Sequence, residues 1–332
     1  MRRFMGWLFF QMKFSSWAYS ALMQISTQLP PVCNHRHQEP KLSQVNCSEE
    51  ERHQYRDLVD RAVEARTHAY APNSHSMVGS AILARDGKVY SSGNFELTPY
   101  ADHGEQLAVA FALADGQNPK DLKACAVFVA KEGGPTPEDF HKQANMTSCG
   151  NCRQAIFEIN PEMHEVLLAS DGQNVEVYRA GDMLPHAYHR ERTPVPNPAP
   201  PFSDNPDPLI AQALVARSRS FVPRTNEPVG AAVETMDGHI YTGIRVETSS
   251  FSTQAERVAL ANAMMHGEHA IKRMVIVGGG SAQGEVPKRL SWDALQAVAQ
   301  QSPEAQVTLP DGQGGFVTQS IKDVPGYLLT HS

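Results

Sequence analysis

The sequence contains an internal repeat, and this repeat limits the possible fold more than any other feature. Six segments of the first half return in the second half, in the same order and at similar spacing. The matching pairs are Val78–Ile82 with Val229–Val233, Asp86–Tyr90 with Asp237–Tyr241, Asn94–Glu96 with Arg245–Glu247, His103–Glu105 with Gln254–Glu256, Val127–Val129 with Val275–Val277, and Cys149–Ile156 with Ser291–Val298. Such ordered matches indicate a tandem duplication with a period of about 150 residues.

A proline-rich segment separates the two copies. Residues 193–208 contain seven prolines, which excludes a helix or a central strand there. We therefore expect four parts, which are an N-terminal extension (1–47), a first domain (48–192), the linker (193–208) and a second domain (209–332).

Helical and strand patterns follow one another within the first copy. Apolar residues recur at helical spacing from about residue 48 to 69, and two more helices are expected at about 102–113 and from Cys149 onward. Short apolar runs bounded by turn residues predict strands at 77–83, 89–93, 124–130, 165–169 and 175–178.

Charge and the N-terminus exclude several classes of protein. The chain has 332 residues and a formal net charge of −7, which is unfavourable for nucleic-acid binding. Before Glu39 there are Arg2, Arg3 and Lys13 but no acidic residue, as in transit peptides. The apolar run in this region is too short to span a bilayer. We expect a disordered or targeting extension, with neither nucleic acid nor a membrane as partner.

Two short motifs of the first copy supply residue types that bind zinc. His103 and Glu105 stand at the start of one predicted helix, and Cys149 and Cys152 at the start of another. One histidine and two cysteines leave the fourth position of a tetrahedral zinc site for water, as a catalytic site requires. Glu105 could then move protons without binding the metal. Alternatively, the cysteines are redox-active or belong to a structural site with Cys125, although Cys125 lies in an apolar strand.

The pattern around these motifs resembles cytidine deaminases, particularly their two-domain homodimeric form, from about residue 50 to 329. The segments that carry the resemblance are Tyr70–Gly79, Asn94–Glu96, His103–Glu105, Ser148–Gln154 and Leu184–Tyr188. The resemblance implies an α/β fold with two tandem α/β/α sandwiches, each containing a mixed sheet of about five strands. It also implies a homodimer in which the first copy keeps the zinc site.

The resemblance further implies a role for each site residue. The zinc (Zn²⁺) ligands are His103, Cys149 and Cys152. Glu105 is the catalytic proton carrier, and Arg153 orients the two thiolates. The substrate contacts are Asn94 and Glu96 for the ribose, the Thr147 carbonyl for the amine, and Phe251 as an aromatic wall contributed to the partner subunit.

The chain departs from the family pattern at four places. Gly104 replaces alanine, which loosens the start of a helix, and Ser148 replaces proline, which makes the backbone less rigid. Ser76 stands where relatives stack a phenylalanine on the base, so the affinity for cytosine or the choice of base could differ from that of relatives. An apparent insertion at about 133–145 could form a lid.

The second copy lacks the metal ligands. Gln254, Ser291 and Ala294 occupy the ligand positions, and none of them is a strong zinc ligand. Glu256 remains but has no metal-bound water to act on. We therefore expect a metal-free, structural second domain.

Together these features predict hydrolytic deamination of cytidine or deoxycytidine to the uridine form in pyrimidine salvage. One alternative is a deaminase of another aminated nucleoside or base, and another is a catalytically weak zinc-binding scaffold. Five cysteines are too few for a disulfide framework, which favours a reducing compartment. We expect a cytoplasmic protein, or an organellar one if the basic extension directs import.

Overall fold

The structure is a computed structural model of the chain. It describes residues 42–97, 100–131, 133–134, 147–169, 171–188, 205–281 and 284–324. Most of the predicted extension, linker and insertion lies outside these residues, so the boundaries of the four parts remain predictions.

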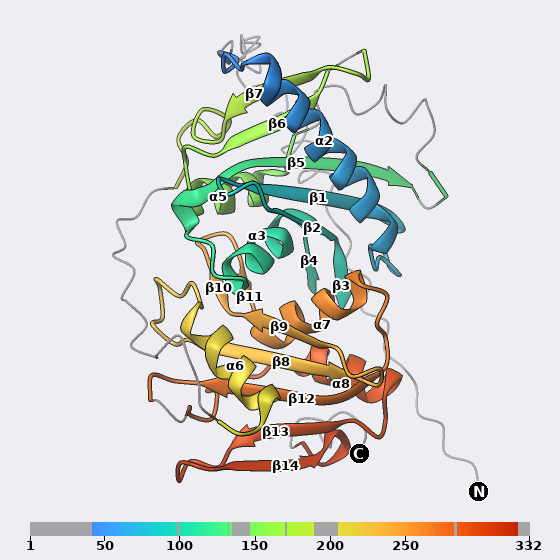
Figure 1. Ribbon diagram of the computed structural model, residues 1–332, viewed down its shortest axis with the longest axis vertical. Helices are drawn as coiled ribbons and strands as arrows, with labels where there is room; N and C mark the ends of the chain where they lie inside the picture. Colours follow the sequence, from blue (N-terminus) through green and yellow to red (C-terminus); the bar gives the residue numbers. More distant parts are fainter. Residues whose placement is uncertain are drawn as a thin grey trace, which may run out of the picture. The chain divides into compact units, whose positions relative to one another are not determined.

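Two five-stranded sheets with equivalent strand order organise the described chain (Figure 1). The first sheet has the order β2-β1-β5-β6-β7, and the second has the order β9-β8-β12-β13-β14. In each sheet one pair is parallel, β5 with β6 and β12 with β13, and the other neighbours are antiparallel. The predicted pair of mixed five-stranded sheets is confirmed.

The first half supplies the elements that carry the predicted zinc ligands. Its helices and strands are α2 (Glu49–Ala65), η1 (Arg66–His68), β1 (Ser76–Ala84), β2 (Val89–Gly93), β3 (Phe95–Leu97), β4 (Tyr100–Asp102), α3 (Gly104–Ala114), η2 (Pro119–Asp121), β5 (Leu122–Lys131), α5 (Gly150–Ile159), β6 (His164–Leu168) and β7 (Val175–Arg179).

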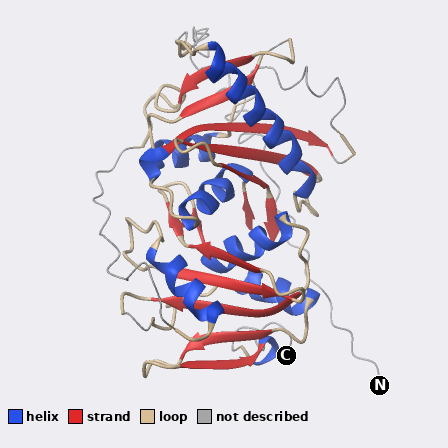
Figure 2. Ribbon diagram, in the orientation of Figure 1, coloured by secondary structure: helices blue, strands red, loops and turns tan. Residues whose placement is uncertain are grey.

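The second half repeats most of this order. Its elements are α6 (Pro208–Ser218), β8 (Val229–Thr235), β9 (Ile240–Ile244), β10 (Val246–Glu247), β11 (Ser252–Thr253), α7 (Ala255–Met265), β12 (Ile271–Gly278), α8 (Trp292–Gln301), β13 (Gln306–Pro310), β14 (Phe316–Ser320) and η3 (Ile321–Asp323). Figure 2 distinguishes the helices from the strands.

Helices cover both faces of each sheet. Along β1, Ala81 and Leu83 belong to a buried cluster with Leu58 of α2, whereas Ile82 belongs to a cluster with Leu107 of α3. Successive side chains of a strand point to opposite faces, so α2 and α3 lie on opposite sides of the sheet. The strands of the second half divide in the same way between α6 and α7. The predicted α/β/α sandwiches are therefore confirmed.

Two glycines allow the first helix of each half to lie directly on its sheet. A Cβ atom at Gly79 would lie 2.0 Å from the Ala62 carbonyl oxygen, and one at Gly230 would lie 2.3 Å from the Ala213 carbonyl oxygen. Only glycine permits these approaches of strand to helix backbone.

The two halves share one hydrophobic core. Leu107 of α3 and Val258 of α7 belong to the same buried cluster. Helix α3 also packs against β9, and α7 packs reciprocally against β2. Such reciprocal contacts are those of a pseudo-two-fold axis between the duplicated halves.

The sequence placed one functionally important boundary wrongly. The helix expected from about residue 102 begins at Gly104, because Tyr100–Asp102 form strand β4, paired with β3. This short hairpin and its counterpart β10–β11 were not predicted from the sequence. The predicted helix start at Ser48 is confirmed by a capping box between Ser48 and Glu51. No helix among the described residues has the length and apolarity needed to cross a membrane.

Candidate metal centre and active site

The three predicted zinc ligands come together at two helix starts. His103 is the N-cap of α3, Cys149 is the N-cap of α5, and Cys152 lies in the first turn of α5. The His103 Nδ1 atom lies 3.5 Å from Cys149 Sγ and 3.3 Å from Cys152 Sγ. Among the described residues, this is the one group of at least three histidine, cysteine or acidic side chains close enough to hold a metal ion.

The donor set fits zinc. The ligand atoms of His103, Cys149 and Cys152 all lie within 4.8 Å of one another, and zinc prefers nitrogen and thiolate ligands. Hydrogen bonds with Cys152 and His103 lower the pKa of Cys149 to about 3. A cysteine of low pKa is present as thiolate, which is the form that binds metal.

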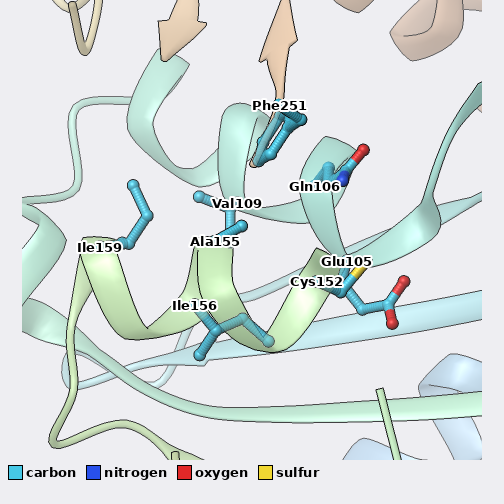
Figure 3. Close-up of a pocket in the computed structure, with 8 residues that line it drawn as sticks. All are labelled: Glu105, Gln106, Val109, Cys152, Ala155, Ile156, Ile159 and Phe251. Atoms are coloured by element: carbon cyan, nitrogen blue, oxygen red, sulfur yellow. The ribbon is translucent and has the colours of Figure 1, made fainter. Parts of the chain in front are cut away.

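Glu105 lies beside this group in the first turn of α3. Its side chain is fully buried, and this burial raises its carboxyl pKa above the usual value. Glu105 and Cys152 line one pocket together with Phe251 (Figure 3). Within that pocket, the Glu105 carboxylate points away from the Phe251 ring. The arrangement places a buried carboxyl group next to the candidate metal ligands.

A second buried carboxyl group at this site was not predicted from the sequence. Glu165 of β6 accepts a hydrogen bond from the Ser148 backbone N–H, with 2.6 Å between Glu165 Oε1 and the nitrogen. Burial raises the pKa of Glu165 to about 7. The replacement of the family's proline by Ser148 supplies the N–H that makes this contact, and that replacement was the available signal.

Arg153 lies on α5 but contacts a different part of the chain than expected. Its Nη1 atom donates to the Met183 carbonyl oxygen at 2.9 Å. The Arg153 backbone N–H donates to the Cys149 carbonyl oxygen at 2.8 Å, but within the described residues no hydrogen bond joins the Arg153 side chain to either cysteine. The side chain therefore ties α5 to the 180–188 segment, and its effect on the thiolates stays a prediction.

Asn94 and Glu96 organise the segment that leads into β1. Asn94 Oδ1 accepts from the Val78 N–H at 2.9 Å. Glu96 accepts hydrogen bonds from the backbone N–H groups of Asn73 and Ser74, and from the Ser74 hydroxyl. Glu96 also lies on β3, which pairs with the strand that ends just before the first metal ligand. These contacts position a loop, and ribose binding by either residue stays a prediction.

The second half contains the same carboxylate contact. Glu247 accepts from the backbone N–H groups of Arg224 and Thr225, and from the Thr225 hydroxyl. Glu247 is the counterpart of Glu96 in the repeat. Because the contact persists in the half that lacks metal ligands, its first role is to fold the turn.

Phe251 lines a pocket with Glu105 and Cys152 of its own chain, and its contribution to a partner subunit's site stays a prediction. Ser249 N–H donates to the carboxylate of Glu158 at 2.9–3.0 Å, and the Ser250 hydroxyl donates to the Asn151 carbonyl oxygen at 3.0 Å. Both acceptors belong to α5 of the first half. Thr147, the remaining predicted contact, is half-buried just before the first cysteine ligand.

The ligand positions of the second half hold a polar network. Gln254 and Ser291 are again helix N-caps, of α7 and α8, and Ala294 is buried. The Ser291 N–H donates to Glu256 Oε1 at 2.8 Å. Arg257, the next residue of α7, pairs with Asp293 of α8. Backbone and charge contacts therefore connect the two helix starts that a metal would connect in the first half.

The fold and the site together define a zinc-binding deaminase domain. Residues 52–168 match a family model described as the cytidine and deoxycytidylate deaminase zinc-binding region, and residues 171–286 match a second model with the same description. The chain belongs to this family. Membership confirms the resemblance inferred from the motifs and, with the donor set, the prediction of zinc as cofactor.

The chain is similar to several proteins named cytidine deaminase. The chain is 28% identical over 231 residues to cytidine deaminase of Sodalis glossinidius, covering 64% of this chain and 69% of the relative. It is 32% identical over 136 residues to cytidine deaminase of Halalkalibacterium halodurans, covering 40% of this chain and 93% of the relative. The crystal structure of cytidine deaminase from Burkholderia pseudomallei is 36% identical, with a TM-score of 0.33, covering 40% of this chain and 97% of that chain.

Proposed function

We propose that this protein hydrolyses cytidine or deoxycytidine to the corresponding uridine nucleoside and ammonia. The observation that carries the proposal is the convergence of His103, Cys149 and Cys152 beside the buried Glu105. The relatives named cytidine deaminase support the same substrate class.

Each residue of the centre then has a definite task. His103, Cys149 and Cys152 hold the zinc ion, which, when bound, would lower the pKa of a coordinated water molecule toward neutrality. Glu105 carries one proton of the attacking water to the ring nitrogen and the other to the departing amine. Its burial keeps the proton away from bulk water during this transfer.

The proposed substrate contacts follow from the family resemblance and from the places of these residues in the chain. Asn94 and Glu96 bind the ribose, and a carboxylate has capacity for acceptor bonds beyond those that Glu96 already makes. The Thr147 carbonyl accepts from the amine, because it directly precedes the segment that carries the cysteine ligands. Phe251 supplies an aromatic wall, which the resemblance assigns to the partner subunit's site, and Arg153 orients the helix that carries Cys152.

Assembly, pathway and compartment belong to the same proposal. Family resemblance supports a homodimer that acts in pyrimidine salvage. The cysteine ligands need reduced thiols, which supports the cytoplasm or another reducing compartment. We retain the four-part division of the chain, with the catalytic domain at 48–192 and the metal-free domain at 209–332.

Ammonia release from cytidine and deoxycytidine by the purified full-length chain tests the proposal. We expect release by the wild type and its loss in Glu105→Gln at unchanged zinc content. Adenosine, guanosine and blasticidin-type aminated nucleosides form the comparison panel, because Ser76 replaces the family's stacking phenylalanine. Release from one of these alone would show a different substrate, and release from none would favour a zinc-binding scaffold.

A further inference from the structure

A buried arginine of the second half contacts the strand that ends just before the metal ligand His103. We propose that Arg257 is a positioning residue for the zinc ligand His103: it holds the end of strand β4 and thereby fixes where the His103 ring stands. The inference deepens the proposed function and rests on it, since it takes His103 to be a zinc ligand.

The contact runs through Asp102, the residue that directly precedes His103 and ends β4. Its side chain is buried, and both of its carboxylate oxygens are bound by the second half. The Thr253 hydroxyl donates to Asp102 Oδ1 at 2.8 Å, and Arg257 Nε donates to Asp102 Oδ2 at 2.6 Å. A buried carboxylate with both oxygens bound has little freedom to move, so the backbone at Asp102 is fixed from across the repeat.

Arg257 also binds the other end of the same strand. Its Nη2 atom donates to the Tyr100 carbonyl oxygen at 3.3 Å. The arginine side chain is 5% exposed and forms a further ion pair with Asp293 of the second half. A planar guanidinium with several fixed donors can bind all three groups at once, which a lysine ammonium cannot do with the same geometry.

Few other contacts fix the backbone of His103 and of the strand before it. Its backbone is extended, with φ −80° and ψ 153°. Its N–H donates to Gln106 Oε1 at 3.1 Å, and its carbonyl oxygen accepts from the Leu107 N–H. Strand β4 is three residues long and pairs with β3 on one side. A shift at Asp102 would therefore pass directly to the ring nitrogen that faces Cys149 and Cys152.

The repeat shows that this contact is not a general requirement of the packing. In the matched positions, Arg257 corresponds to Gln106, and Asp102 corresponds to Thr253. Gln106 binds the His103 backbone within its own half. The arginine occurs in the half without metal ligands, and the aspartate occurs in the half with them.

The ion pair is also poorly explained by stability alone. Taking two charges out of water costs free energy that their attraction only partly offsets, and apolar pairs of similar volume are often as stable. A contact that instead sets the geometry of one ligand gives a reason to keep the charges. Substituting a residue that orients a metal-binding histidine commonly weakens metal affinity by about 10- to 100-fold.

The experiment compares metal binding by full-length variants. Zinc affinity is measured by chelator competition, and ligand geometry is measured by the visible absorption of the cobalt(II)-substituted protein. We expect Arg257→Met to bind zinc about 10- to 100-fold more weakly and to have a changed cobalt spectrum. Arg257→Lys should restore part of the affinity, because one donor to Asp102 returns.

Two further variants keep the test decisive. Asp102→Asn combined with Arg257→Met removes both charges and so avoids an unpaired buried carboxylate, in case the single variant does not fold. Arg217→Met is the matched control, since Arg217 is also a buried arginine of the second half, donating to the Gly278 carbonyl oxygen. We expect this control to lower the melting temperature while leaving zinc affinity and the cobalt spectrum as in the wild type.

Wild-type zinc affinity and an unchanged cobalt spectrum in the double variant would overturn the positioning role. So would an equal loss of zinc affinity in the Arg217→Met control, which would show a general effect of instability. A wild type that binds no zinc would instead refute the proposed function, and this inference with it.

Discussion

The two halves have one topology but differ in what joins their helix starts. In the first half, the N-caps of α3 and α5 are His103 and Cys149; in the second half, the N-caps of α7 and α8 are Gln254 and Ser291. The backbone brings these positions together in both cases. The same topology therefore occurs with and without metal ligands at these positions.

The buried carboxyl groups differ between the halves as well. In the second half, Glu256 accepts from the backbone N–H of Ser291. In the first half, Glu165 accepts from the N–H of Ser148, one position before the matched cysteine. The sheet registers place Val307 where the first half has Glu165. The first half thus has an additional carboxyl group to hold this segment, so that Glu105 need not do so.

The largest difference should appear when the two matched glutamates are replaced. We expect Glu105→Gln to lower kcat for ammonia release by about 10²- to 10⁴-fold, since general acid–base catalysis contributes that much. Glu256→Gln should keep kcat within about twofold, because the amide oxygen still accepts from Ser291. Comparable losses of kcat in both variants, at equal zinc content, would contradict separate roles for the halves.

Glu165 should make the stability of the first half depend on pH. Its pKa of about 7 lies above the unfolded value of 4.5, so the folded protein binds a proton more tightly. The contribution of Glu165 to the free energy of unfolding is fully present below pH 4.5 and is lost as the pH rises through about 7. Relative to wild type, Glu165→Gln should gain about 3 kcal/mol in free energy of unfolding between pH 4.5 and 8. Urea unfolding at each pH measures this, and parallel pH profiles would contradict the assignment.

The glutamates that fold the entry turns should both contribute to stability, but only Glu96 should affect catalysis. Glu96→Ala and Glu247→Ala each leave two backbone N–H groups without their acceptor. We expect Glu96→Ala to lower the free energy of unfolding by about 1–3 kcal/mol. Glu247→Ala should lower it further, because it also removes an ion pair with the buried Arg245. Only Glu96→Ala should also raise KM for the nucleoside. An unchanged KM would show that Glu96 folds the turn and does not bind ribose.

The metal centre and the two equivalent sheets could be predicted from the sequence. The short motifs His103–Glu105 and Cys149–Cys152 at helix starts, together with the family resemblance around them, were enough to predict the metal centre. The duplication likewise predicted two equivalent sheets, since the turn and strand patterns recur in order.

The remaining features depend on contacts between residues far apart in sequence. Glu165 looked like an ordinary strand residue, and the replacement of proline by Ser148 indicated a free N–H but not the acceptor that binds it. The Asp102–Arg257 pair joins the two halves, and the position of Phe251 depends on how they pack. Hydrophobic periodicity carries no information about such contacts.

The smallest predicted effect concerns the residue between His103 and Glu105. A Cβ atom at Gly104 would lie 2.9 Å from the Ser92 carbonyl oxygen, so this glycine avoids a close contact and does more than loosen the helix. Gly104→Ala should lower the free energy of unfolding by about 1 kcal/mol, because crowding outweighs the gain in helix propensity. In the second half, Ala255→Gly should cost about the same amount through lost helix propensity alone. Thermal melts of both variants measure these effects, and a stabilised Gly104→Ala would contradict the crowding.

The most direct test of the whole account is the zinc content per chain of the purified protein. We predict one zinc ion per chain in the wild type, about none in Cys149→Ala, and one in Ser291→Ala, the matched variant of the second half. Two zinc ions per chain, or zinc retained in Cys149→Ala, would contradict the assignment of the metal centre to the first half alone.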